Sequence, residues 1–215
     1  MTYKAVIFDL DGTLVNSLSD IATATNTVLA NNNFPTHDDQ AYNFFVGSGL
    51  RTSVARALPA HAQTETEIDR CYDEMMLIYN RDCTLTTKPY SGIISLLDQL
   101  KAKGIKLAVL SNKADALTKK IAGEIFPDYF EIIQGLTTEE FKKPNPVVAL
   151  QMAAQLGVQP NEVLYVGDSG VDMETAVNAQ FHAVGVLWGF RPKEELLATG
   201  AQTLLHNAEE LLELL

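Results

Sequence analysis

The sequence predicts an α/β protein, in which a doubly wound, Rossmann-like parallel sheet carries a helical domain inserted after its first strand. Three observations support this prediction. Short β-branched apolar runs recur along the chain, helical patterns separate the later runs, and the stretch after the first run shows helical periodicity alone. Alternating strands and helices are typical of a parallel sheet covered on both faces. The predicted core therefore spans residues 1–15 and 87–215, and the inserted domain spans 16–86.

The predicted strands are short apolar runs of the kind that fill a buried parallel sheet. They cover 3–10, 105–110, 131–135, 163–166 and 182–187. Between the later strands, apolar residues at helical spacing predict a helix that ends near Gly104. Asn145-Pro146 predicts the start of another helix, which ends near Gly157. The segment that begins at Asn207 is predicted to be a capped amphipathic helix.

The inserted segment contains two stretches with helical spacing of apolar residues and no convincing strand. One stretch runs from 21 to 29 and the other from 68 to 79. Met75 and Met76 in the second stretch are expected to fill the core of this domain. The cysteines Cys71 and Cys83 are too few for a disulfide framework and are expected to be ordinary thiols.

Composition and charge exclude several classes of protein. Of 215 residues, 47% are hydrophobic, which is ordinary for a globular protein and excludes general disorder. The net charge of −11 argues against a nucleic-acid-binding protein. No apolar stretch approaches the ~20 residues that span a bilayer, and the N-terminal apolar run is too short for a signal peptide. We therefore expect a cytoplasmic protein without a nucleic-acid or membrane partner. The sequence does not predict its oligomeric state.

Candidate site residues begin directly after the first predicted strand, in Asp9-Leu10-Asp11-Gly12-Thr13. Ligands of open parallel sheets bind at the carboxyl ends of the strands. Alternation along an extended chain would point the Asp9 and Asp11 side chains to the same side, and two crowded carboxylates require a cation nearby. Thr13 could hold one carboxylate in place. An ordinary strand-to-loop turn is the alternative, because Asp and Gly are common in turns.

A second acidic segment, Gly167-Asp168-Ser169-Gly170-Val171-Asp172, follows another predicted strand. Ser169 and Asp172 match a capping box, so helix capping alone can explain Asp172. The capping box does not explain Asp168. Together with the carboxylates after the first strand, Asp168 would complete an all-oxygen site, which suits Mg²⁺ better than zinc.

Two further strand ends carry polar residues that suit an anionic ligand. Ser111-Asn112 would offer a hydroxyl and free backbone amides at a helix start, although a simple N-cap would look the same. Lys143 is held in a stiff turn before Pro144, but the neighbouring Lys142 leaves open which lysine faces the site. Each residue has an ordinary explanation. The combination of acids, hydroxyl and lysine, all after strands, predicts one shared site.

These four segments resemble the four motifs of the haloacid dehalogenase superfamily, and more closely those of its phosphoglycolate phosphatase-like branch. The motifs extend from the first strand to beyond residue 172 and so cover essentially the whole chain. Trp188-Gly189-Phe190-Arg191 also resembles a turn that is common in this branch. The resemblance implies that residues 16–86 form a helical cap. Asn16 and Ser91 depart from the usual residues at the two ends of that cap.

The resemblance implies a Mg²⁺-dependent phosphomonoester hydrolase that acts through an aspartyl-phosphate on small phosphorylated metabolites, with 2-phosphoglycolate as the preferred candidate. Asp9 would be the nucleophile, and Asp11 would serve first as acid and then as base. Lys143 would neutralise charge between the phosphate and Asp9. The residues implied to bind substrate are Thr13, Ser111 and Asn112, and those implied to hold or support Mg²⁺ are Asp9, Asp11, Asp168 and Asp172.

Three alternatives stay open at this point. A sugar phosphomutase or a pyrophosphatase of the same superfamily would use similar motifs, and a non-catalytic binding module could retain the scaffold. Asp11 speaks against a true dehalogenase, which resembles this family without that acid or a metal.

The sequence of the inserted domain offers one candidate for substrate selection. Gly47-Ser48-Gly49-Leu50-Arg51 contains two glycines that would let the backbone approach a ligand closely. Arg51 is a candidate partner for a second anionic group, such as the carboxylate of 2-phosphoglycolate, by a bidentate contact. The alternative is an ordinary solvated helix residue.

Overall fold

The computed structural model describes residues 3–215 and divides the chain into two compact units. One unit comprises the N-terminal segment up to Val15 together with Pro89–Leu215, and the other comprises Asn16–Lys88. The expected boundary between residues 86 and 87 therefore falls inside the second unit, close to its end. Two-residue strands, β2 (Val15–Asn16) and β3 (Lys88–Pro89), pair where the chain leaves the first unit and returns to it.

The first unit alternates strands and helices along the chain. Its strands are β1 (Ala5–Phe8), β4 (Lys106–Ala114), β5 (Ile132–Leu136), β6 (Val163–Gly167), β7 (His182–Val186) and β8 (Thr203–Leu205). Its α-helices are α5 (Ile93–Ala102), α6 (Asp115–Ile125), α7 (Val147–Gln155), α8 (Gly170–Asn178) and α9 (Lys193–Ala198). Its 3₁₀ segments are η2 (Glu139–Phe141), η3 (Pro160–Glu162) and η4 (Ala208–Leu214).

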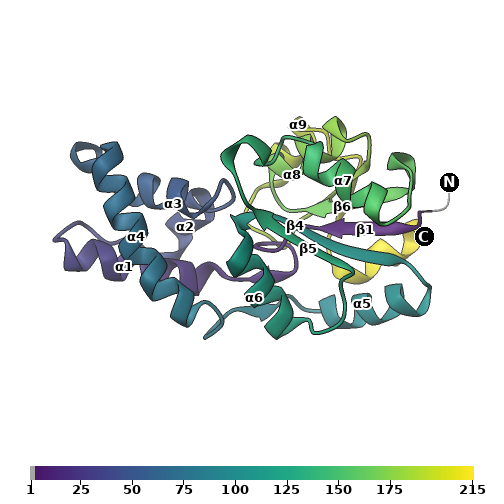
Figure 1. Cartoon of the computed structure of the whole chain (residues 1–215), viewed down its shortest axis with the longest axis horizontal. Helices are drawn as coiled ribbons and strands as arrows, with labels where there is room; N and C mark the ends of the chain where they lie inside the picture. The colour runs from purple at the N-terminus through teal and green to yellow at the C-terminus, as the bar shows by residue number, and fades with distance from the viewer. Residues whose placement is uncertain (1–2) are drawn as a thin grey trace. The chain divides into compact units, whose positions relative to one another are not determined.

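The strands form one parallel sheet in the order β5-β4-β1-β6-β7-β8. Figure 1 shows α5 and α6 on one face of this sheet and α7, α8 and α9 on the other. β1 lies between β4 and β6, and all of its residues are buried. Its sequence is apolar throughout because neither face of the strand meets water. The predicted doubly wound α/β fold is confirmed.

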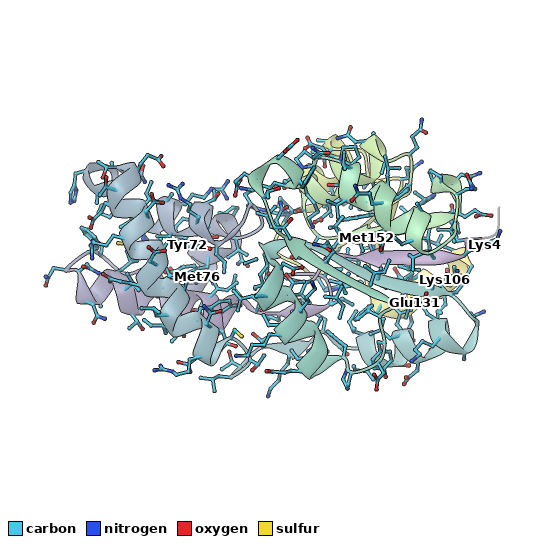
Figure 2. All side chains as sticks on the ribbon, viewed as in Figure 1. Lys4, Tyr72, Met76, Lys106, Glu131 and Met152 are labelled. Atoms are coloured by element: carbon cyan, nitrogen blue, oxygen red, sulfur yellow. The ribbon has the colours of Figure 1, made fainter. Side chains whose placement is uncertain are left out.

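Alternate residues of β1 pack on opposite faces of the sheet, as the period of a strand requires. Ala5 and Ile7 belong to a buried cluster that includes Met152 of α7 (Figure 2) and Met173 of α8. Burying such a large apolar side chain stabilises the folded state by roughly 1.5–3 kcal/mol. This packing fixes the central strands, whose carboxyl ends carry the candidate site residues.

The second unit is built from helices α1 (Leu18–Asn31), α2 (Asp39–Phe45), α3 (Leu50–Ala57) and α4 (Glu65–Asp82), with a 3₁₀ turn η1 (Ala60–Ala62). α1 and α4 pack against each other through apolar residues at the predicted helical spacing. Met75 is fully buried, whereas Tyr72 and Met76 on α4 are half-buried (Figure 2). Cys71 and Cys83 are buried thiols. No helix in the described part of the chain has both the length and the apolar character needed to cross a membrane.

Asp20, in the first turn of α1, ties this helix to the segment that leads out of the second unit. Its carboxylate accepts hydrogen bonds from the backbone amides and the hydroxyls of both Thr86 and Thr87, over 2.5–3.1 Å. Burial favours the neutral acid, but these hydrogen bonds outweigh burial and lower the pKa of Asp20. The two ends of the unit are thus joined by a buried, charge-assisted contact.

Three elements of the first unit differ from the sequence-based expectation. β8 was not predicted, because three residues are too few to show a strand pattern. The strand expected to end at Leu110 continues as β4 to Ala114, with a shift of register after Leu110. The segment after Asn207 is a 3₁₀ helix, a form that the apolar spacing does not distinguish from an α-helix. Its cap is as expected, because the Asn207 side chain accepts from the amide of Glu210 at 3.3 Å.

Candidate active site

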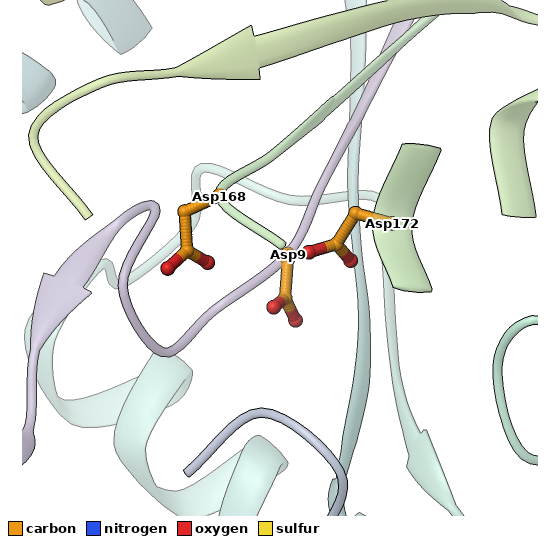
Figure 3. Close-up of side chains that lie close together, drawn as sticks. All are labelled: Asp9, Asp168 and Asp172. Atoms are coloured by element: carbon orange, nitrogen blue, oxygen red, sulfur yellow. The ribbon is translucent and has the colours of Figure 1, made fainter. Parts of the chain in front are cut away.

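Three carboxylates meet at the carboxyl edge of the central strands. Asp9 follows β1, Asp168 follows the neighbouring strand β6, and Asp172 lies in the first turn of α8. All three are buried, and their nearest oxygens lie within 4.8 Å of one another (Figure 3). The parallel sheet thus brings together acids that lie more than 150 residues apart in the sequence.

The mutual proximity of these acids disfavours their ionised forms. Burial, followed by repulsion from Asp172, raises the pKa of Asp9 to about 7. Burial and the neighbouring carboxylates of Asp172 and Asp9 likewise raise the pKa of Asp168 well above its usual range. A bound cation would relieve this repulsion, and an all-oxygen donor set suits a hard divalent ion.

Lys143 supplies positive charge beside the carboxylates. Its Nζ lies 2.9 Å from Asp9 Oδ1 and 2.7 Å from Asp172 Oδ1, and it donates to the carbonyl of Leu110 at 3.1 Å. Burial opposes this charge, but the two carboxylates raise the pKa of Lys143 well above its usual range. The neighbouring Lys142 instead pairs with Glu139 at 3.1 Å. Lys143 is therefore the lysine that lies among the candidate site residues.

Asp172 is engaged through both of its carboxylate oxygens. Oδ2 accepts from the amide of Ser169 at 3.1 Å and from its hydroxyl at 2.6 Å, while Oδ1 accepts from Lys143. The expected link between Asp172 and the start of the helix is present. The same carboxylate also holds Lys143 in place, and this contact could not be predicted from the sequence.

Asp168 is enclosed by two backbone turns. Thr13 Oγ1 donates to Oδ1 at 3.3 Å, and the backbone amide of Phe190 donates to Oδ2 at 2.8 Å. Gly12 has a φ of +84°, and a Cβ there would lie 2.2 Å from Asp168 Oδ2. A Cβ on Gly189 would lie 2.2 Å from the Cβ of Asp168. Only glycine fits at these two positions, so the turns themselves shape the cradle of Asp168.

The Trp188–Arg191 turn contributes a further contact to this cradle. The indole Nε1 of Trp188 donates to the carbonyl of Thr13 at 3.0 Å, which fixes the loop after β1 against the turn after β7. The Thr13 hydroxyl binds the carboxylate of Asp168, whereas a bond to one of the two carboxylates in its own segment was expected. Its implied contact with substrate stays a prediction.

Ser111 and Asn112 lie within β4 rather than at a helix start, because α6 begins only at Asp115. The Ser111 hydroxyl accepts from the amide of Lys113 at 3.2 Å. The Asn112 side chain binds the main chain of Lys143: Oδ1 accepts from its amide at 2.8 Å and Nδ2 donates to its carbonyl at 3.3 Å. Asn112 thus holds the main chain of Lys143, and its implied contact with substrate stays a prediction.

Asp11 lies outside the carboxylate cluster identified among the described residues, although its charge is one of the causes that raise the pKa of Asp9. The segment after β1 is not a regular strand, because β1 ends at Phe8 and Gly12 turns the chain with a positive φ. Both oxygens of Asp11 lie 2.7 Å from Lys113 Nζ. Lys113 was not among the predicted site residues, although a lysine two residues after Ser111 on a buried strand was an available signal.

Arg51 lies in the second unit, in the first turn of α3. Its Nε donates to Asp69 at 2.8 Å and its Nη2 donates to Glu65 at 2.5 Å. Gly47 and Gly49 both have positive φ, and Gly49 is the N-cap of α3. The glycine turn is therefore present, while a role of Arg51 toward a substrate stays a prediction.

The fold and the cluster of Asp9, Asp168 and Asp172 beside Lys143 define the class of protein. It is an α/β enzyme with buried acids and a lysine at the carboxyl ends of its strands. Residues 6–186 match the family model of haloacid dehalogenase-like hydrolases. The matched range contains all four sequence segments described above. The chain belongs to the haloacid dehalogenase-like hydrolase family, which confirms the resemblance seen in its sequence.

Individual relatives align over nearly the whole chain. A phosphoglycolate phosphatase from Aquifex aeolicus is 34% identical over 189 residues, covering 87% of this chain and 86% of its own. An N-acetylmuramic acid 6-phosphate phosphatase from Pseudomonas aeruginosa is 29% identical, covering 100% of this chain and 96% of its own. A crystal structure from Lactobacillus delbrueckii, provisionally described as a phosphoglycolate phosphatase, has a TM-score of 0.93 at 31% identity and covers 100% of this chain and 98% of its own.

Proposed function

We propose that this protein is a Mg²⁺-dependent phosphatase that hydrolyses small phosphorylated metabolites through an aspartyl-phosphate on Asp9. The observation that carries the proposal is the buried Asp9 carboxylate beside the Lys143 ammonium and two further acids. A carboxylate that attacks an anionic phosphate needs positive charge around it, because like charges repel. Membership of a hydrolase family and relatives that are named phosphatases support the reaction class.

The donor set of the cluster supports Mg²⁺ as the cofactor. Asp9 and Asp168 would hold the ion directly, together with the backbone carbonyl of Asp11, and Asp172 would support this shell. Mg²⁺ prefers oxygen ligands and commonly takes one or two carboxylates along with substrate phosphate. When bound, the ion would neutralise charge on the phosphoryl oxygens.

The residues of the chain would divide the reaction into two steps. In the first, an oxygen of Asp9 attacks phosphorus, the ester P–O bond breaks, and Asp11 gives its proton to the leaving oxygen. In the second, Asp11 takes a proton from a water molecule that attacks phosphorus. The bond between phosphorus and Asp9 then breaks and phosphate is released. Lys143 would offset charge beside Asp9 in both steps, and Ser111 would bind a phosphoryl oxygen.

The substrate proposed first is 2-phosphoglycolate, which is supported by the name of the Aquifex aeolicus relative. N-acetylmuramic acid 6-phosphate is the second candidate, supported by the name of the Pseudomonas aeruginosa relative. Both are phosphate esters of alcohols that also carry a carboxylate. We therefore expect a screen of phosphorylated metabolites, ranked by kcat/KM, to favour esters with a second anionic group.

The nucleophile and the metal are tested together in a rapid-quench experiment with ³²P-labelled substrate. We expect Mg²⁺-dependent hydrolysis that EDTA abolishes, and transient labelling of the wild-type protein that Asp9→Asn lacks. Asp9→Asn should lose about three or more orders of magnitude in kcat. Substantial turnover by this variant, with contaminating phosphatase excluded, would contradict the proposal. A labelled intermediate that water does not hydrolyse would favour a phosphomutase instead.

A further inference from the structure

Lys113 and Asp11 form an ion pair that the proposed chemistry does not yet explain. Both carboxylate oxygens of Asp11 lie 2.7 Å from Lys113 Nζ. The side chain of Lys113 is 1% exposed and that of Asp11 is 11% exposed, so water screens the pair only weakly. A lysine buried to this degree needs a compensating charge, and Asp11 supplies it.

The backbone around Lys113 fixes the base of its side chain. Its amide donates to the Ser111 hydroxyl at 3.2 Å, and its carbonyl accepts from the Thr118 hydroxyl at 3.1 Å. Gly135 on the neighbouring strand β5 packs so closely that a Cβ there would lie 2.6 Å from the Lys113 carbonyl. The side chain therefore extends from a rigid point of the sheet toward Asp11.

The two buried lysines of the site serve different acids. Lys143 contacts Asp9 and Asp172, which belong to the carboxylate cluster, whereas Lys113 contacts Asp11, which lies outside it. Asp11, the proposed proton-transfer residue, is thus paired with Lys113, whereas Asp9, the proposed nucleophile, is paired with Lys143.

We propose that Lys113 is a positioning residue that holds the Asp11 carboxylate where it can exchange a proton with the leaving oxygen; this inference rests on the proposed function. A carboxylate can accept about four hydrogen bonds, two on each oxygen. The Lys113 ammonium takes up one of them on each oxygen of Asp11. The leaving oxygen and water would contact other acceptor positions of the same carboxylate. Lys113 acts on the reaction only through Asp11.

The basicity of the leaving group separates this role from general support of the fold. A simple alkoxide leaves only if it is protonated, whereas 4-nitrophenolate leaves readily without a proton. For Lys113→Met, we expect kcat/KM to fall about thirtyfold or more with 2-phosphoglycolate and with ethyl phosphate, but about threefold or less with 4-nitrophenyl phosphate. Lys113→Arg should restore part of the loss, because it keeps the charge. Lys119→Met is the matched control, since Lys119 is exposed and pairs with Asp115 on α6.

A double-mutant cycle tests whether Lys113 acts through Asp11. We expect Lys113→Met to cost no further activity in the Asp11→Asn background. The double variant also removes both charges of the pair, so it keeps the test valid if Lys113→Met alone fails to fold. Thermal unfolding of each variant reports on folding.

Three results would overturn the inference. The first is an equal loss of kcat/KM in Lys113→Met on alkyl and aryl phosphate esters. The second is a loss of kcat/KM with 2-phosphoglycolate but not with ethyl phosphate. The third is lower activity of the double variant than of Asp11→Asn alone. The second of these would mean that Lys113 binds the carboxylate of the substrate. If the wild-type protein with Mg²⁺ hydrolyses none of these esters, the proposed function itself fails, which is a distinct outcome.

Discussion

The side-chain amide of Asn112 forms two hydrogen bonds with the main chain of Lys143. Its Oδ1 accepts from the Lys143 amide at 2.8 Å, and its Nδ2 donates to the Lys143 carbonyl at 3.3 Å. Asn112 lies in β4, whereas Lys143 lies in the loop before α7. This contact determines where the Lys143 backbone sits relative to the sheet. From there the side chain reaches Asp9 and Asp172. The asparagine thus contributes to the site by holding a cation.

Replacing Asn112 tests this role. Asn112→Ala leaves the buried amide of Lys143 without its acceptor, which should lower the free energy of unfolding by about 1–3 kcal/mol. The displaced ammonium should lower kcat about tenfold or more, with little change in KM, because Lys143 is proposed to act during phosphoryl transfer. Steady-state kinetics and urea unfolding measure the two effects. The exposed Asn161→Ala serves as control. A stability loss with unchanged kcat would contradict the positioning role.

The sequence predicted which strand ends carry the site, but not how its side chains pair. Acids and polar residues after apolar runs indicated Asp9, Asp168 and the Lys142-Lys143 pair, because parallel strands align their carboxyl ends. Lys113 pairs with Asp11, which lies 102 positions away in the sequence. Asn112 forms hydrogen bonds with Lys143, which lies 31 positions away. Such contacts depend on strand order and on the shifted register of β4, which periodicity alone does not specify.

Asp168 and Asp172 should respond differently to the same change, because they accept hydrogen bonds differently. In Asp172→Asn, one amide end must face Lys143 or the amide of Ser169, so a donor meets a donor. We expect this variant to lose roughly 3 kcal/mol or more of unfolding free energy. Asp168→Asn can still accept from Phe190 and donate to the Thr13 hydroxyl.

The Asp168→Asn variant should therefore fold nearly normally but require about tenfold more Mg²⁺ for half-maximal activity, since it loses a proposed ligand charge. Thermal unfolding and Mg²⁺ titration of activity measure the pair of variants side by side. Equal loss of stability in both would contradict the assignment of Asp172 as the structural partner of Lys143. An unchanged Mg²⁺ requirement in Asp168→Asn would remove that residue from the proposed metal site.

The turn after β7 offers a test that changes no charged group. In Gly189→Ala the added methyl would lie 2.2 Å from the Cβ of Asp168 and 2.5 Å from the carbonyl of Gly12. Both neighbours must shift, so we expect a raised Mg²⁺ requirement and lower kcat. Gly123→Ala is the matched control, because no heavy atom beyond its chain neighbours and the backbone of its own helix lies within 4 Å of the added methyl. This helical substitution should instead stabilise by about 0.5–1 kcal/mol. Wild-type Mg²⁺ dependence in Gly189→Ala would show that the turn does not shape the site.

The fold followed from the sequence most fully where burial imposes a pattern. β1 is apolar throughout because both of its faces are buried. The apolar residues of α5 recur at helical spacing because only one face of this helix is buried. β8 and η4 are short, and their secondary structure depends on tertiary contacts. β8 pairs with β7 at the edge of the sheet, and η4 packs against α5 and β8. The contact of Asp20 with Thr86 and Thr87 is of the same kind, because it joins the two ends of a unit.

Asp20 makes stability of the second unit depend on pH. Burial alone would raise its pKa, but hydrogen bonds from Thr86 and Thr87 lower it below the reference value of 3.8. The unfolded chain therefore binds a proton at higher pH than the folded chain does. Consequently, the stabilising contribution of Asp20 is fully present well above this reference value and is lost as the pH falls through the lower folded-state pKa.

Asp20→Asn should remove this contribution. At about pH 7 we expect a loss of about 1.5–3 kcal/mol in unfolding free energy, the range of a hydrogen bond to a charged group. At about pH 3 the variant and the wild type should differ less, because the unfolded wild-type chain is then largely protonated at this carboxyl and part of the contribution is lost. Urea unfolding followed by far-ultraviolet circular dichroism measures both differences, and the exposed Asp73→Asn on α4 is the control. A difference between Asp20→Asn and wild type that stays constant over this range would mean that the charge of Asp20 adds nothing to its hydrogen bonds.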